Sequence, residues 1–244
     1  MRYFIHLAYK GTNYHGWQSQ PDAISVQEIL EKALETILRK PMSIMGAGRT
    51  DAGVHAKEMY AHFDFDGSID SQNLIRKLNS FLPKDIVIFN ILNVHDAAHA
   101  RFDATKRTYE YHIHTQKNPF ECNDSWQYSI RLNIEKMNEA CAILFEYSDF
   151  ECFSKTHTDV NTFNCKIHQA NWKRDEKNLI FTISADRFLR NMVRAIVGTM
   201  INIGLEKVSL EDFKKIIESK DRGKAGFSVP AHGLYLTKIE YDYI

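Results

Sequence analysis

The order of strand and helix patterns along the chain limits its fold most, because the same order occurs twice. Alternating apolar residues predict strands, and apolar residues at helical spacing predict helices. The clearest helix follows Ser25, where Glu28 stands three positions on, as in a capping box. The first half is predicted to contain a strand over 2–9, a helix over 26–38, a short strand over 42–45, a strand over 58–65, a helix over 71–82 and a strand over 86–94.

The second half repeats this order without an obvious repeat of residues. It is predicted to contain a strand over 107–114, a helix over 134–147, strands over 166–173 and 179–185 joined by a turn at 174–178, a helix over 187–203, an extra helix over 209–219 and a strand over 234–243. We therefore expect an α+β fold of two ferredoxin-like (β-α-β-β-α-β, RRM-like) halves with antiparallel sheets packed side by side. The predicted domains are residues 1–104 and 105–244, with an active-site cleft between them.

Composition indicates an ordinary globular protein, since the 244 residues are 44% hydrophobic and 25% charged. No apolar run approaches the roughly 20 residues of a membrane span, and the first residues lack a small-residue cleavage site, so we expect no membrane association or targeting segment. The four cysteines have no CxxC spacing, which favours reduced thiols and a cytoplasmic location. His95 and His99 lack the glutamate of a zincin motif between them, so no metal is predicted.

Residues 46–56, Gly-Ala-Gly-Arg-Thr-Asp-Ala-Gly-Val-His-Ala, place the carboxylate of Asp51 in a loop with three glycines. Glycine accepts positive φ and lets another chain approach closely, so this loop looks shaped around another group. Arg49, two positions earlier, favours the ionised carboxylate. An oriented, ionised carboxylate can act as a nucleophile, although a loop aspartate is more commonly a turn residue.

The predicted helix over 187–203 has an apolar face, and its opposite face carries Arg187, Arg190, Asn191 and Arg194. A solvated polar face is one interpretation. Arginines without lysine also suit bidentate contacts to phosphates or to one buried carboxylate. On the predicted strand over 107–114, Tyr109 and Tyr111 share a face; we expect Tyr111 to fill the core, whereas an exposed tyrosine can stack on an RNA base.

These motifs resemble the TruA family, that of tRNA pseudouridine synthase A. Residues 48–55 match its signature, residues 188–194 its Phe-Leu-x-x-Met-Val-Arg segment and residues 107–111 its Arg-x-Tyr-x-Tyr pattern. Further matches occur at 9–12, 16–21, 78–86, 99–102 and 233–236, so the resemblance covers most of the chain. Lys10 departs from the family, which usually has an acidic residue there.

The resemblance implies an isomerase that flips a uridine of the tRNA anticodon stem-loop (tRNA positions 38, 39 and 40) out of its stack and converts it to pseudouridine. Asp51 is the implied catalytic residue and Arg194 its partner, with Tyr109 against the base and Leu234 or Leu236 beneath it. Arg49 would fill the vacated space, and Arg187 and Arg190 would contact substrate. The implied enzyme is a homodimer. It needs no cofactor, because the reaction loses no atoms.

Several alternatives stay open at this point. Asp51 can attack C1′ of the ribose or C6 of the base, or the reaction can pass through a glycal. A catalytically silent RNA-binding module is the main rival, although RNP-type aromatic strands are missing from the sequence. The Gly46-x-Gly48 pattern lacks the third glycine of a dinucleotide loop. A basic stretch at 214–224 is either a solvated surface or a phosphate contact, and the net charge of zero does not decide between them.

Overall fold

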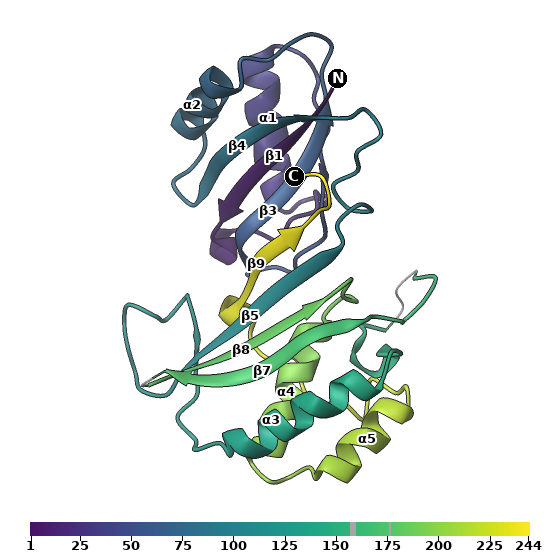
Figure 1. The fold of residues 1–244 in the computed structure, drawn as a ribbon. Coiled ribbons are helices and arrows are strands. Elements are labelled where there is room, and N and C mark those ends of the chain that lie inside the picture. Colours follow the sequence, from purple (N-terminus) through teal and green to yellow (C-terminus); the bar gives the residue numbers. More distant parts are fainter. Residues whose placement is uncertain (157–159, 176) are drawn as a thin grey trace. The chain divides into compact units, whose positions relative to one another are not determined.

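A computed structural model describes residues 1–156, 160–175 and 177–244 of the chain. Strands and helices both contribute to it, so the predicted α+β class is confirmed (Figure 1). The chain divides into two compact units, the first comprising Met1–Thr105 and Tyr235–Ile244 and the second Lys106–Leu234. The predicted domains, 1–104 and 105–244, differ from these units at Thr105 and in residues 235–244, because both belong to the first unit.

The first unit is a sheet with two helices. Its elements are β1 (Arg2–Tyr9), α1 (Val26–Leu38), β2 (Met45–Gly46), β3 (His55–Asp64), α2 (Ser71–Phe81), β4 (Ile86–Val94) and β9 (Leu234–Glu240, within the unit from Tyr235). β1 lies between β4 and β3 and is antiparallel to both. β2 pairs with β3 in antiparallel fashion, and β9 pairs with the start of β3 in parallel. The C-terminal strand thus extends the sheet formed by the first hundred residues.

Helix α1 forms where its sequence pattern predicts it. The side chain of Ser25 accepts a hydrogen bond from the Glu28 amide at 3.2 Å, which confirms the N-cap. Leu30, Ala33 and Leu34 are completely buried and form its inner face. Figure 1 shows α1 and α2 together on one side of the sheet of the first unit.

The second unit also combines a sheet with helices. Its elements are β5 (Lys106–His114), β6 (Trp126–Gln127), α3 (Ile134–Ile143), β7 (Ile167–Asp175), β8 (Asn178–Ala185), α4 (Met192–Gly204) and α5 (Leu210–Glu218). β8 lies between β5 and β7 and is antiparallel to both. The turn predicted over 174–178 is too long, because Arg174 pairs with Leu179 and Asp175 with Asn178 within the two strands. Glu176, in the predicted turn, lies outside the described residues.

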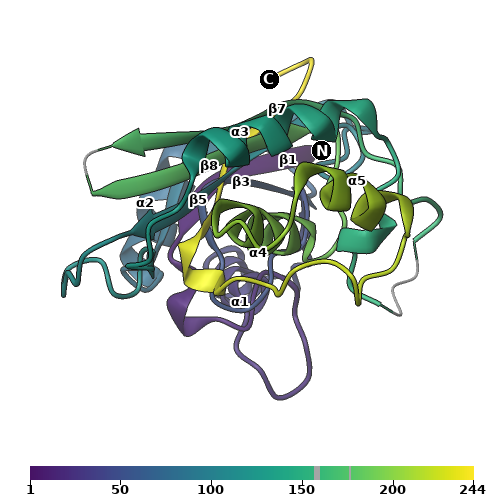
Figure 2. The same ribbon diagram turned by 90° about the horizontal axis from the view of Figure 1, so that it is seen from below.

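Helix α4 forms the core of the second unit, packed against α3 (Figure 2). Most of its residues are buried, and the indole of Trp172 on β7 donates a hydrogen bond to the Met200 sulfur at 3.2 Å. Despite this apolar composition, α4 is too short to cross a bilayer, as is every other helix in the described parts of the chain.

Candidate functional site

The loop that carries Asp51 connects β2 to β3. Gly46 and Ala61 are paired at its base, and the Ala47 amide donates to the Tyr60 carbonyl at 2.8 Å. Arg49 is exposed and Asp51 is partly exposed. The candidate nucleophile therefore stands on a loop whose two ends belong to the same sheet.

A tight turn follows Asp51. The Val54 amide donates to the Asp51 carbonyl at 3.2 Å, which closes a β-turn over residues 51–54. Gly53, at the third position, has φ of +80°, the value that a type II turn requires and that glycine adopts without strain. The role of Gly53 is therefore to set the direction of the chain immediately after the carboxylate.

The opening segment, residues 9–17, packs against this loop. A Cβ atom on Gly46 would lie 2.3 Å from the indole nitrogen of Trp17, and one on Gly16 would lie 2.2 Å from the Thr50 carbonyl oxygen. A Cβ atom on Gly48, in contrast, would meet nothing within 4 Å. Of the three loop glycines, Gly46 and Gly53 thus serve the protein's own packing and turn geometry. Sequence reasoning noted the opening segment only as a family match, although its glycines and Trp17 signal close packing.

In the second unit, Tyr109 and Tyr111 lie on β5 with different surroundings. Tyr111 is completely buried, as expected, and its hydroxyl donates to the Pro230 carbonyl at 2.8 Å. Tyr109 is partly exposed, and its ring meets that of Phe188 edge-on, with ring centroids 5.1 Å apart. Of the two tyrosines, Tyr109 is therefore the one with accessible surface for a ligand.

The predicted helix over 187–203 is wrong at its beginning. Asn191 has φ of +68°, in the left-handed region, and α4 begins only at Met192. Of the predicted polar stripe, only Arg194 lies on the helix. Arg187 reaches the Thr162 carbonyl at 3.3 Å, whereas Arg190 is exposed. The left-handed residue turns the chain, so the arginines do not share one helical face.

Arg194 is held in the first turn of α4. Its Nε donates to the Val229 carbonyl at 2.8 Å, and its own carbonyl accepts from the Val229 amide at 3.3 Å. The chain around Val229 runs so close to α4 that a Cβ atom on Gly198 would lie 1.8 Å from the Phe227 carbonyl oxygen. This segment, which sequence reasoning missed, orients the guanidinium.

Leu234 and Leu236 are 6% and 2% exposed, so burial does not distinguish them as the residue beneath a base. Leu234 ends the second unit, whereas Leu236 pairs with Ala56 in the first. Asp51 and Arg49 belong to the first unit, and Tyr109, Arg187, Arg190 and Arg194 belong to the second.

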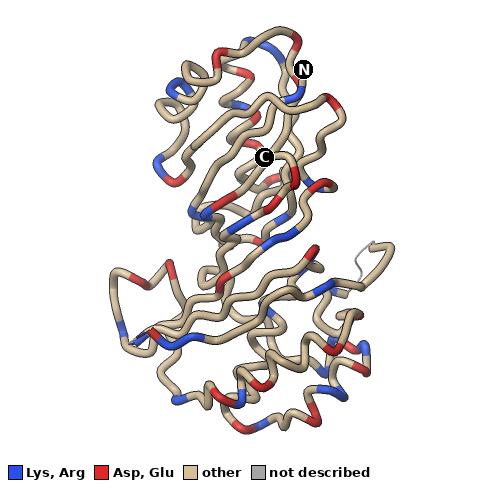
Figure 3. The backbone as a smooth tube through the Cα atoms, viewed as in Figure 1, with Lys and Arg blue, Asp and Glu red and all other residues tan. Residues whose placement is uncertain are grey.

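In the basic stretch at 214–224, three lysines form ion pairs with acidic side chains. Lys214 contacts Glu146 at 2.8 Å, Lys215 contacts Asp212 at 3.4 Å and Lys220 contacts Asp149 at 2.6 Å. Acidic residues accompany the basic ones along α5 (Figure 3). These pairings favour the interpretation as a solvated surface.

Within residues 1–156, 160–175 and 177–244, the cysteines and histidines show no arrangement for metal binding. Cys141, Cys152 and Cys165 are buried free thiols, and burial raises the pKa of each to about 12. In the described parts of the chain, no three His, Cys, Asp or Glu side chains gather closely enough to hold a metal ion.

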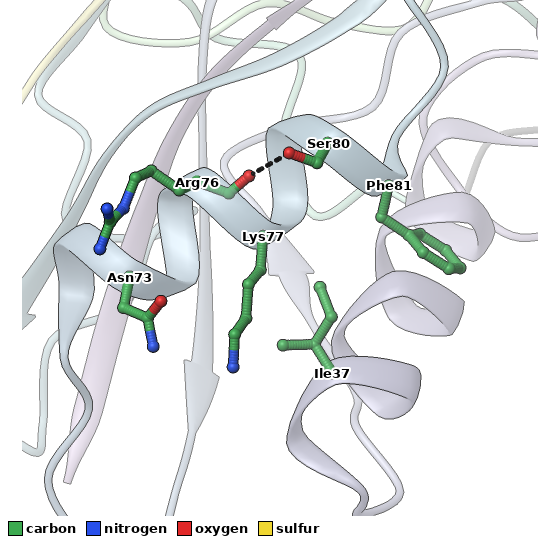
Figure 4. Close-up of a pocket in the computed structure, with 6 residues that line it drawn as sticks. All are labelled: Ile37, Asn73, Arg76, Lys77, Ser80 and Phe81. Carbon is green, nitrogen blue, oxygen red and sulfur yellow. Dashed lines mark hydrogen bonds between the residues drawn. The ribbon is translucent and has the colours of Figure 1, made fainter.

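An open hollow of about 540 Å³ lies between α1 and α2. Figure 4 shows Asn73, Arg76 and Lys77 projecting from α2 and Ile37 from α1. None of its lining residues belongs to the motifs that suggested a catalytic site.

Comparisons with known proteins match most of the chain. A family model described as tRNA pseudouridine synthase matches residues 6–103 and 141–242, which include Asp51 and Arg194 but not Tyr109. This chain is also similar to proteins named tRNA pseudouridine synthase A. It is 57% identical to the one from Bacteroides fragilis, 52% identical to the one from Porphyromonas gingivalis and 41% identical to the one from Clostridium acetobutylicum. These alignments cover 98%, 98% and 96% of this chain and 96%, 97% and 97% of the relatives.

Proposed function

Because this chain belongs to the tRNA pseudouridine synthase family, we propose that it isomerises uridines in the anticodon stem-loop of tRNA, at positions 38, 39 and 40. Pseudouridine synthases are isomerases, and the near full-length match to relatives of that name carries this proposal. The motif loop supports it, since Asp51 lies partly exposed between a close-packed segment and a tight turn.

The proposed reaction exchanges one bond for another. The C1′–N1 bond of uridine breaks, the base turns, and C1′ joins C5; C5 loses a proton and N1 gains one, so no redox partner is needed. Asp51 attacks C1′, as carboxylates do in retaining glycosidases, or it attacks C6, or a base removes the C2′ proton to give a glycal. All three routes require the uridine to leave its stack.

The other site residues have supporting roles in this proposal. Arg194 pairs with the Asp51 carboxylate, and its hydrogen bond to the Val229 carbonyl supports a fixed orientation. Tyr109 stacks on the base, and Leu234 or Leu236 lies beneath it. Arg49 fills the space that the flipped base leaves, while Arg187 and Arg190 contact the tRNA backbone as separate cations rather than as one helical stripe.

The proposal also covers the assembly. We take the two halves as ferredoxin-like domains that form the active-site cleft, and the active species as a cytoplasmic homodimer, as the family resemblance implies. The element order β1-α1-β2-β3-α2-β4 and the strand order β4-β1-β3-β2 support this topology for the first half.

Tritium release from tRNA labelled with [5-³H]uridine in the anticodon stem-loop tests the proposed function. Wild type should release tritium, because C5 gives up its hydrogen when it joins C1′. Asp51→Asn removes the nucleophile while keeping the side-chain shape, so we expect turnover to fall by several powers of ten with tRNA affinity retained. Asp66→Asn, at an exposed aspartate outside the motif, is the matched control.

Two results would contradict the proposal. Asp51→Asn activity within about tenfold of wild type would remove the nucleophile assignment. Tight tRNA binding without tritium release from any variant would favour a silent RNA-binding module or another RNA substrate.

A further inference from the structure

We propose that Tyr9 is a positioning residue for the reaction, acting on Asp51 through the side chain of Thr50. This inference rests on the proposed role of Asp51. Tyr9 is the last residue of β1 and is 3% exposed. Its hydroxyl lies 2.9 Å from the Thr50 hydroxyl, and Thr50 directly precedes Asp51 in the chain.

Tyr9 is a rigid anchor. Its backbone pairs with Ala56 on β3 and with Ile86 on β4, so it is held from both sides. Its ring packs near that of Trp17, with centroids 6.1 Å apart. The β1–β3 register shifts between Leu7 and Tyr9, and such irregularities re-aim side chains beside functional sites.

The backbone contacts restrict Thr50 and the turn after Asp51, and the Tyr9 bond adds a side-chain restraint. The Thr50 carbonyl accepts from the Trp17 amide at 3.4 Å and faces Gly16, where a Cβ atom would not fit. After Asp51, the Gly53 amide donates to the Tyr14 carbonyl at 3.3 Å. The Tyr9–Thr50 bond limits rotation of the Thr50 side chain and therefore of the peptide that leads into Asp51.

This restraint matters because a nucleophile must be placed to within a fraction of an ångström of the reacting atom. A displacement of about 1 Å costs on the order of 100-fold in rate. Tyr9 should therefore affect the chemical step rather than the binding of tRNA.

The test measures kcat and KM for tritium release by Tyr9→Phe, Thr50→Val and Thr50→Ser. Tyr9→Phe and Thr50→Val remove one hydroxyl each, and we expect each to lower kcat by about 10- to 100-fold with KM within about twofold of wild type. Thr50→Ser keeps the hydroxyl, so its kcat should stay close to that of wild type. The double variant Tyr9→Phe/Thr50→Val should be no slower than either single one, because both remove the same bond.

Tyr3→Phe is the matched control. Tyr3 lies on the same strand, is 2% exposed, and its hydroxyl bonds to the Gly67 carbonyl at 3.3 Å and the Ile69 amide at 3.2 Å. The Tyr3→Phe variant loses comparable hydrogen bonds at the opposite end of β1 from Tyr9, so its kcat should match that of wild type. Circular dichroism establishes that each variant is folded at the assay temperature.

Wild-type kcat in Tyr9→Phe, or equal losses in Thr50→Ser and Thr50→Val, would overturn the inference. If Tyr9→Phe does not fold, the comparison of Thr50→Val with Thr50→Ser decides alone. Failure of the proposed function itself is separate, because it appears as retained activity in Asp51→Asn or as no activity in wild type.

Discussion

At the scale of single residues, burial separates side chains that the sequence pattern treats alike. Tyr109 and Tyr111 are two positions apart, so the pattern places both on one face of β5, yet only Tyr111 is buried. His62 on β3 is a second case, since it is 8% exposed although histidine is polar. Its Nδ1 accepts a hydrogen bond from the Ala100 amide at 3.1 Å, an arrangement that requires this nitrogen to be unprotonated.

Burial lowers the pKa of His62 to about 4, and the positive charge of Arg2 and of protonated His99 adds to this effect. An unfolded histidine titrates near 6.5, so between about pH 6.5 and 4 the unfolded chain binds the extra proton. The free energy of unfolding should therefore be at its full value above about pH 6.5 and fall on acidification, by at most about 1.4 kcal/mol per pH unit from this group.

Urea denaturation of wild type and His62→Asn at pH values from about 7.5 to 4.5 measures this effect. Asparagine supplies an acceptor oxygen and does not titrate, so the variant should lose less stability on acidification. Identical slopes for the two proteins would exclude His62 as a source of acid sensitivity.

At the scale of elements, the beginning of α4 shows how tertiary contacts overrule periodicity. Leu189 is 5% exposed and continues the apolar pattern, but it precedes the helix. The Met192 amide bonds to the Leu189 carbonyl at 3.1 Å, and the Asn191 side chain donates to the Ser228 hydroxyl at 2.8 Å. Asparagine tolerates the left-handed conformation better than other residues that carry a Cβ atom.

Comparing Asn191→Ala with Asn191→Gly isolates this backbone conformation. Both variants lose the hydrogen bond to Ser228, whereas only glycine adopts positive φ without strain. We expect Asn191→Ala to be less stable than Asn191→Gly by about 1 kcal/mol in urea denaturation. Equal stability, or a less stable glycine variant, would show that the φ at residue 191 is not strained.

At the scale of the whole molecule, the C-terminal residues belong to the unit that the N-terminal residues form. Tyr241 is 7% exposed, and its hydroxyl donates to the Ala100 carbonyl at 2.6 Å. Its ring meets Phe4 and Tyr60 edge-on, at centroid distances of 5.5 and 5.3 Å. The end of the chain therefore covers aromatic side chains of β1 and β3.

Two substitutions measure this contribution separately. Tyr241→Phe removes the hydrogen bond and should lower the free energy of unfolding by about 1 kcal/mol. Tyr241→Ala also removes the ring and should lower it by about 3–5 kcal/mol. If urea denaturation gave less than about 1 kcal/mol for the alanine variant, the C-terminal segment would not stabilise the first unit.

The sequence alone determined the features that depend on neighbouring residues. Periodicity and a cap were enough for α1, and the motif spacing singled out the loop of Asp51 as a candidate site. Tertiary structure decided what depends on distant residues: the hydrogen bond between the Tyr9 and Thr50 hydroxyls, the left-handed Asn191 beside Ser228, and the pairing of Lys214 with Glu146. The physical reason is range, because local patterns specify a segment's conformation and buried face, whereas its contacts depend on which distant segment reaches that face.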